Sequence, residues 1–189
     1  GSDGKTTTTS LIHKMLSDGG YKTWLGGNIG NPLLSFVDEM TEDDYVVLEL
    51  SSFQLHTMKK SPERAVITNL SPNHLDWHID YQEYIDAKTN IYKAMSGENR
   101  LVLNADNADS MKLLPIDNCE VKTFSRRGEG YVKLNGDTIV CNGESVLNIC
   151  DIKIPGMHNV ENYMAAICAT EGLVTKDVIV NTAKTLGGV

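Results

Sequence analysis

The chain opens with the sequence GSDGKTT over residues 1–7. This stretch has the form of the second half of a phosphate-binding loop, whose full pattern is a strand, then Gly-x-x-x-x-Gly-Lys-Ser/Thr, then a helix. Glycines let backbone N–H groups turn toward phosphate oxygens, and the N-terminus of the following helix favours an anion. We therefore expect nucleotide contacts from Gly1, Ser2, Asp3, Gly4, Lys5, Thr6 and Thr7.

Two side chains of this loop have particular chemical roles. Lys5 is expected to reach the terminal phosphates as a point charge, and the hydroxyl of Thr6 is expected to bind Mg²⁺. The alternative is a glycine-rich turn that caps a helix and leaves Lys5 in solvent. The strand and first glycine of the full pattern lie outside the chain, so we expect a strand ahead of Gly1.

Composition limits the class of protein. The chain has 189 residues, of which 41% are hydrophobic and 22% charged, as in one soluble globular domain. A net charge of −8 argues against nucleic-acid binding, and no apolar run is long enough to cross a membrane. The cysteines show no Cys-x-x-Cys spacing and indicate reduced thiols in a cytoplasmic protein; they are Cys119, Cys141, Cys150 and Cys168.

Beyond the loop, residues 6–17 carry apolar side chains at helical spacing, and Gly19-Gly20 is expected to end that helix. A short strand is predicted at residues 22–25, followed by a second glycine-rich turn at residues 26–30. Asn31-Pro32 then has the form of a helix start.

Residues 45–50 form an apolar run typical of a strand that is buried on both faces. Glu49 interrupts it, and a carboxylate at the end of a central strand is costly unless it meets a cation. In phosphate-loop enzymes an acid at this place holds Mg²⁺. The alternative is a strand-end glutamate that points into solvent.

A second buried strand, at residues 65–70, leads into the loop of residues 71–78. Such loops at the carboxyl ends of parallel strands are where these sheets bind substrates. His74, Asp76 and His78 are candidate metal or phosphate contacts there, although each alone is more often a surface residue.

The next predicted helix carries a lysine within its apolar stripe. The stripe consists of Tyr81, Tyr84, Ile91, Tyr92 and Met95, and Lys88 falls in its middle. Such a lysine either extends past the core to solvent or is buried, and burial would lower its pKa and free a neutral amine to react.

The sequence pattern changes in the last third of the chain. A strand is predicted at residues 100–104, and short alternating runs over residues 119–154 predict a small antiparallel sheet whose hairpins contain Asn-Gly pairs. A helix then opens near Gly156, and Asn159 and Asn162 lie three apart, so both can face one ligand. The predicted fold class is α/β, a mostly parallel sheet flanked by helices with an added antiparallel part.

Several short motifs occur together in a characteristic order. They are GSDGKTT (1–7), GGNIG (26–30), LELSSFQL (48–55), NHLD (73–76), YIDAKTNIY (84–92) and GMHNVEN (156–162). Together they resemble the Mur ligases, ATP-dependent amide-forming enzymes of peptidoglycan synthesis, and residues 48–55 look most like the D-glutamate-adding branch. Asn73 departs from the pattern, because many relatives have Asp before the histidine.

The resemblance implies a role for each matching residue. Lys5 would bind the ATP phosphates; Thr6 and Glu49 would hold one Mg²⁺. His74 would hold a second Mg²⁺ together with Lys88, which matches a carbamylated lysine, so that Lys5, His74 and Lys88 would be catalytic. UDP-N-acetylmuramoyl-L-alanine would face Asn28, Ser51, Gln54 and His74, and the adenine side of ATP would meet Asn159 and Asn162.

The resemblance also implies that residues 1–189 are a central ATP-binding domain, without the N-terminal UDP-binding and C-terminal domains of the family. The fragment is then expected to be inactive alone and the intact enzyme to be a monomer with small-molecule substrates. Alternatives are another Mur ligase, a folylpolyglutamate synthetase, or a nucleotide-binding domain without synthetic activity.

Overall fold

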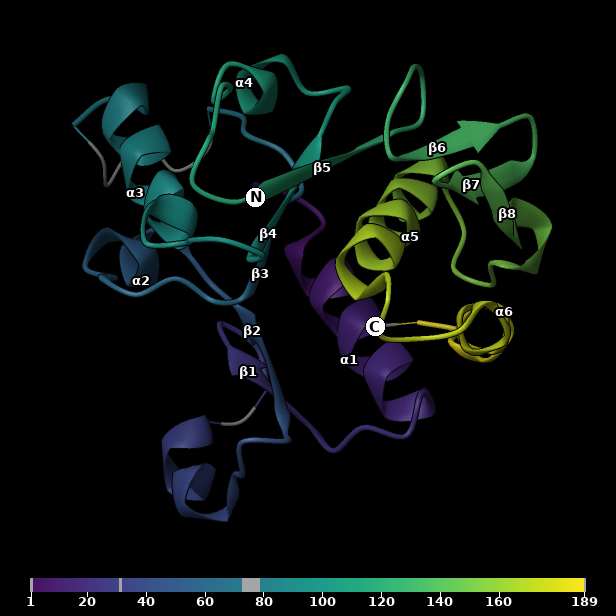
Figure 1. The fold of residues 1–189 in the computed structure, drawn as a ribbon, viewed down its shortest axis with the longest axis horizontal. Helices are drawn as coiled ribbons and strands as arrows, with labels where there is room; N and C mark the ends of the chain where they lie inside the picture. The colour runs from purple at the N-terminus through teal and green to yellow at the C-terminus, as the bar shows by residue number, and fades with distance from the viewer. Residues whose placement is uncertain (1, 31, 73–78, 189) are drawn as a thin grey trace.

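The structure is a computed structural model that describes residues 2–30, 32–72 and 79–188. Two sheets form its centre (Figure 1). The first pairs β1 (Thr23–Gly27) in parallel with β2 (Tyr45–Glu49). The second has the order β3-β4-β5-β6-β7-β8, and its strands are β3 (Arg64–Ile67), β4 (Arg100–Asn104), β5 (Glu120–Ser125), β6 (Val132–Asn135), β7 (Thr138–Cys141) and β8 (Glu144–Asn148).

Helices surround both sheets. The α-helices are α1 (Lys5–Asp18), α2 (Ser52–His56), α3 (Tyr81–Lys93), α4 (Ala108–Met111), α5 (Met157–Thr170) and α6 (Lys176–Thr185). The 3₁₀ helices are η1 (Leu33–Glu39) and η2 (Ile149–Asp151). The expected helix after Asn31-Pro32 is thus a 3₁₀ segment, which contains no buried residue.

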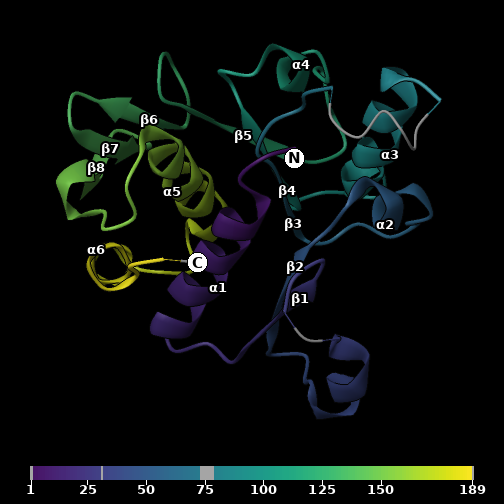
Figure 2. The ribbon, with the colours of Figure 1, turned by 180° about the vertical axis from the view of Figure 1, so that it is seen from behind.

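The helices divide between the two faces of the larger sheet. In β4, Val102 belongs to the cluster built around α1 and α5, whereas Leu101 and Leu103 belong to the cluster that contains Tyr84 of α3. This alternation follows from the two-residue period of a strand. Figures 1 and 2 show α1 and α5 side by side on one face and α3 on the other.

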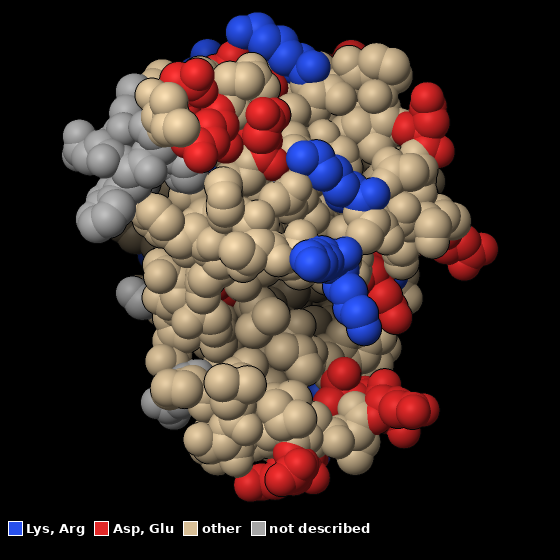
Figure 3. All heavy atoms as spheres, turned by 90° about the vertical axis from the view of Figure 1, so that its left-hand side faces the viewer, with Lys and Arg blue, Asp and Glu red and all other residues tan. Residues whose placement is uncertain are grey.

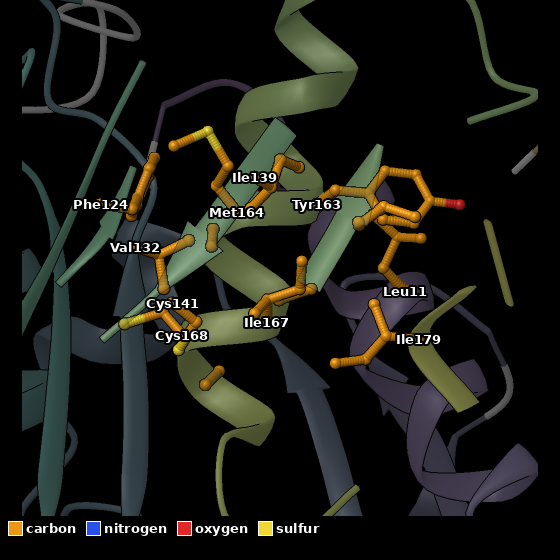
Figure 4. Packing of buried hydrophobic residues seen from close by; sticks show 14 of the residues in the cluster. Leu11, Phe124, Val132, Ile139, Cys141, Tyr163, Met164, Ile167, Cys168 and Ile179 are labelled. Atoms are coloured by element: carbon orange, nitrogen blue, oxygen red, sulfur yellow. The ribbon is translucent and has the colours of Figure 1, made fainter. Parts of the chain in front are cut away.

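The larger core surrounds α5. Tyr163, Met164 and Ile167 are 0–1% exposed and pack against strands β5 to β7 and against α1 and α6 (Figure 4). Each such side chain contributes roughly 1.5–3 kcal/mol of burial free energy. The helix is therefore a fixed support against which α1 and its N-terminal loop are held.

The predicted fold class is confirmed, with one change in the antiparallel part expected at residues 119–154. β5 pairs in parallel with β4 and β6, and antiparallel pairing begins only where β6 meets β7. β5 enters in the direction of β4 because a crossover through α4 separates them. Only the tight turns Gly136-Asp137 and Asn142-Gly143 reverse the chain, and positive φ angles at Gly136, Asn142 and Gly143 fit such turns.

The prediction that residues 45–50 are buried on both faces was wrong. Val46 and Leu48 are 46% and 45% exposed, and only Glu49 of β2 is buried. In the described part of the chain β2 pairs with β1 alone, and α1 covers one of its faces. A cleft of about 780 Å³ lies between β2 and β3, lined by both strands and by side chains of α1 and α3.

Candidate functional site

The loop before α1 is anchored to the carboxyl end of β3. The backbone N–H groups of Ser2 and Asp3 both donate to Asn69 Oδ1 at 2.9 Å, and the Thr68 hydroxyl donates to the Asp3 carbonyl at 2.6 Å. Gly4, the N-cap of α1, has φ +73°, a left-handed conformation that glycine adopts without strain. The loop thus ends on a helix N-terminus, the arrangement that favours a phosphate.

Lys5 reaches back across this loop. Its Nζ donates a 2.7 Å hydrogen bond to the carbonyl of Ser2, and its side chain is partly buried. The ammonium therefore lies beside the loop rather than free in solvent, which disfavours the simple capping turn. Thr7 lies in the first turn of α1 and is also partly buried.

Glu49 ends β2 and meets the phosphate loop from the other sheet. The Thr6 hydroxyl donates to Glu49 Oε2 at 2.7 Å, and the Asn28 side-chain amide donates to Oε1 at 3.2 Å. Gly27 lets the backbones of β1 and β2 approach closely at Glu49, because a Cβ there would come within 2.1 Å of the Glu49 carbonyl oxygen. The solvent-exposed alternative for Glu49 is excluded, since the residue is only 3% exposed.

This set of donors fits a divalent cation. Among the described residues no lysine or arginine pairs with Glu49, so its buried carboxylate is held by two neutral donors only. A buried carboxylate without a counter-charge is costly, and oxygen ligands such as carboxylate and hydroxyl suit Mg²⁺. Among the residues that the structure describes, no three or more His, Cys, Asp and Glu side chains form a group that could hold a metal ion.

Lys88 is buried rather than extended into solvent. The residue is 3% exposed, and its Nζ lies 4.7 Å from the centroid of the Tyr84 ring. Burial, and secondarily the charge of Lys5, lowers the pKa of Lys88 to about 8. Lys88 also lines the cleft that contains Lys5 and Glu49, so these three side chains share one cavity wall.

Sequence reasoning missed the residues that hold α3 against the loop. The Tyr84 hydroxyl lies 2.7 Å from Ser2 Oγ, and Tyr84 stacks on Tyr81, whose hydroxyl donates to Asp109. Nothing in the apolar stripe marks a tyrosine as a loop contact. Thr68 and Asn69 carried a usable signal, because polar residues that follow a parallel strand lie at the binding edge of the sheet.

The predicted substrate contacts Ser51 and Gln54 form a helix cap in this structure. The Ser51 N–H donates to Gln54 Oε1 at 2.8 Å, and the Gln54 N–H donates to Ser51 Oγ at 3.3 Å. This reciprocal pair is the capping box of α2. Gln54 and Asn28 are exposed and Ser51 is partly exposed, so all three remain accessible to a substrate.

Asn159 and Asn162 lie in the first turns of α5 and are 5% and 7% exposed. Their side chains are joined, because Asn162 Nδ2 donates to Asn159 Oδ1 at 3.1 Å. The N-cap of this helix is Gly156 and not Asn159. Gly1, His74, Asp76 and His78 fall outside the described residues, as does Asn73.

Three further observations concern membrane crossing, surface charge and the cysteines. None of the described helices combines the length and the apolarity that a bilayer crossing requires. Uncharged atoms cover most of the face in Figure 3, where acidic side chains occur in several separate places. The four cysteines are free thiols, two of them buried.

The fold and the loop now define a class of protein. The sequence model of one protein family, the Mur ligase middle domain, matches residues 1–170. The chain belongs to this family. The family resemblance expected from the short motifs is thereby confirmed.

Two relatives narrow the comparison within the family. The UDP-N-acetylmuramoylalanine--D-glutamate ligase of Clostridium novyi is 51% identical over 191 residues, and that of Acetivibrio thermocellus is 53% identical over 195 residues. Each alignment covers 100% of this chain and 42% of the relative. The chain therefore spans less than half the length of these ligases.

A solved structure supports the fold. The MurF ligase from Thermotoga maritima, solved in complex with ADP, matches with a TM-score of 0.75 over 100% of this chain and 47% of that one. Its sequence identity is 20%, so the match concerns the arrangement of strands and helices.

Proposed function

We propose that this chain is the ATP-binding domain of a ligase that joins D-glutamate to UDP-N-acetylmuramoyl-L-alanine, a step of peptidoglycan precursor synthesis. The observation that carries the proposal is the junction of the loop at residues 2–6 with Glu49, which places a lysine, a hydroxyl and a buried carboxylate at one edge of the cleft. The two relatives of more than 50% identity bear the name of this activity.

The loop supplies binding for a triphosphate. Backbone N–H groups at the start of α1 and the ammonium of Lys5, which lies against the Ser2 carbonyl, would neutralise phosphate charge. Thr6 and Glu49 would hold Mg²⁺, which when bound offsets the negative charge that gathers as phosphate is transferred. The ADP bound to the Thermotoga relative is in keeping with ATP as the nucleotide.

The reaction proposed is acyl activation followed by amide formation. A carboxylate oxygen of the muramoyl-alanine substrate attacks the γ-phosphorus of ATP, and ADP leaves. The amine of D-glutamate then attacks the carbonyl carbon of the acyl phosphate, inorganic phosphate leaves, and the nitrogen loses a proton. Asn28, Ser51, Gln54 and His74 are proposed to face the first substrate.

Lys88 is proposed to act as a carbamate. Its lowered pKa leaves more of the amine neutral near pH 8, and only a neutral amine adds CO₂. The addition forms an N–C bond and releases a proton, giving a carboxylate on a buried side chain. That carboxylate and His74 would complete a second Mg²⁺ site, with the metal stabilising the negative charge.

A cytoplasmic monomer that acts on small molecules completes the proposal. The net charge of −8 is more compatible with small-molecule substrates than with nucleic-acid binding. Another Mur ligase, a folylpolyglutamate synthetase and a nucleotide-binding domain without synthetic activity are the competing functions.

The deciding experiment measures which amino acid drives phosphate release from ATP in the full-length protein. With UDP-N-acetylmuramoyl-L-alanine present, we expect D-glutamate to stimulate release and L-glutamate, L-lysine and L-alanine to have no effect. Stimulation by L-glutamate with a folate substrate would identify the synthetase instead. ATP binding without stimulation by any pair of substrates would favour the non-catalytic alternative.

A further inference from the structure

The side chain of Asn162 lies against the backbone of the phosphate loop. Gly4 adopts φ +73°, and a Cβ built on it would come within 2.3 Å of Asn162 Oδ1 and 3.3 Å of Asn162 Cγ. Separations below 3.0 Å are not compatible with real Cβ atoms. Gly4 is thus constrained twice, by its left-handed backbone and by the amide of α5 that occupies the space beside it.

Hydrogen bonds hold that amide in place. The Thr8 hydroxyl of α1 donates to Asn162 Oδ1 at 3.3 Å, and the Thr8 N–H donates to the Gly4 carbonyl at 2.9 Å. Asn162 Nδ2 donates to Asn159 Oδ1, and Asn159 Nδ2 donates to the Pro155 carbonyl at 2.7 Å. A chain of bonds therefore runs from the loop through α1 and α5 to the segment that precedes α5.

This arrangement gives Asn162 a function toward the phosphate loop. Asn162 is 7% exposed. Its side-chain oxygen accepts a hydrogen bond from Thr8 and lies beside Gly4, and its side-chain nitrogen donates to Asn159. We propose that Asn162 is a positioning residue that sets the conformation of Gly4, and with it the direction of the phosphate-binding N–H groups. The inference rests on the proposed function, since it assigns Asn162 to the phosphate end of ATP.

The reason for such a support is geometric. Phosphate binding by a loop depends on several N–H groups pointing at one place, and a shift of about 1 Å in such a site is enough to lose much of its effect. Gly4 has no side chain of its own to fix it. Helix α5, most of whose residues are buried, supplies the missing constraint from outside the loop.

The first experiment separates phosphate from adenine. Binding of inorganic tripolyphosphate, ADP and adenosine is measured by competition against a labelled ATP analogue, in the full-length protein with Mg²⁺. For Asn162→Ala we expect affinity for tripolyphosphate, which contains no adenine, to fall at least tenfold. Unchanged affinity for tripolyphosphate, with loss confined to adenosine and ADP, would overturn the proposal.

The second experiment needs no nucleotide. Thermal unfolding of this chain is compared for Gly4→Ala, Asn162→Ala and the double variant, with Gly20→Ala as the matched control. Gly20 has φ +90° and nothing within 4 Å of its built Cβ, so it reports backbone strain alone. We expect Gly4→Ala to lower the melting temperature more than Gly20→Ala does. In the double variant, we expect Asn162→Ala to recover part of the loss caused by Gly4→Ala.

Additive effects of Gly4→Ala and Asn162→Ala would mean that the two residues are uncoupled, and the proposal would then be wrong. The two experiments also separate this inference from the proposed function. A wild-type protein that binds neither ATP nor tripolyphosphate would refute the proposed function, while coupling in the unfolding cycle would still establish the contact between Asn162 and Gly4.

Discussion

The hydroxyl of Thr6, in the first turn of α1, donates a 2.7 Å hydrogen bond to the carboxylate of Glu49, the last residue of β2. The two residues come from separate elements, and each is a predicted Mg²⁺ ligand. Their direct bond shows that the phosphate loop and the smaller sheet form one site. Asn28 completes the contact from the other side of the carboxylate.

Replacing Glu49 by alanine should strongly slow formation of the acyl phosphate in the full-length enzyme. The change removes the buried carboxylate that we assign to Mg²⁺, and loss of such electrostatic stabilisation costs roughly 10²–10³ in rate. ADP release in the presence of the muramoyl-alanine substrate measures it. Glu144→Gln, an exposed carboxylate on β8, is the control and should keep full activity. Near-normal turnover by Glu49→Ala would refute the metal role.

Lys88→Ala should be inactive, and short carboxylates such as acetate or formate should restore part of its activity. They would occupy the space of the proposed carbamate and replace its charge. Lys93→Ala is the matched control, since Lys93 lies on the same helix but is exposed. Mass measurement under non-acidic conditions should show an added CO₂ on the wild-type protein that is missing in Lys88→Ala. A fully active Lys88→Ala enzyme would show that the buried amine serves only the fold.

Glu171→Gln should weaken the fold and change its response to acid. Glu171 bonds to Lys122 at 2.9 Å and to Arg100 at 2.8 Å, and Tyr131 donates to it at 3.0 Å. Burial opposes the charged form, but the bonds from Lys122 and Tyr131 outweigh it, so the pKa of Glu171 lies below its ordinary value of 4.5. We expect a loss of about 1–2 kcal/mol at pH 7, reduced by partial exposure to solvent.

The pH dependence of this stability difference follows from the linkage between proton binding and folding. A carboxyl group whose pKa is lower in the folded state adds stability that is complete above its unfolded pKa and disappears as the pH falls through the folded value. The difference in unfolding free energy between wild type and Glu171→Gln should therefore shrink below about pH 4.5. Denaturant unfolding between pH 7 and pH 3 measures it. A constant difference over this range would contradict the assignment.

An added strand should stabilise the chain by filling the cleft between β2 and β3. Each of these strands has one neighbour among the described residues, so their facing edges carry unpaired backbone groups. The Ser2 N–H donates to the Asn69 carbonyl at 3.0 Å, so a strand leading into Ser2 would lie along the edge of β3. Buried parallel strands are rich in Val and Ile.

The test fuses a six-residue Val/Ile-rich segment ahead of Gly1 and compares it with a Gly/Ser segment of equal length. We expect the apolar segment to raise the melting temperature by about 5 °C or more, as about 1–2 kcal/mol would, and the Gly/Ser segment to leave it unchanged. Equal melting temperatures for the two fusions would show that the cleft does not accept a strand.

Much of the fold could be predicted from local pattern. The helices α1 and α5 appear where the sequence pattern predicted them, and both Asn-Gly pairs lie at hairpins. The burial of β2 could not be predicted, because an apolar run reports what a strand would bury and not whether a neighbour covers it. The direction of β5 also required the structure, since strand pairing depends on crossovers over long stretches of chain.

The sequence by itself determined the loop chemistry, the family and the candidate residues, because glycine, lysine and threonine at fixed spacing act through local backbone geometry. Tertiary structure decided the questions of environment. It buried Lys88 beside Tyr84, joined Thr6 to Glu49, and placed Asn162 against Gly4. Burial and contact between distant residues depend on how helices and sheets pack, and no local spacing records that.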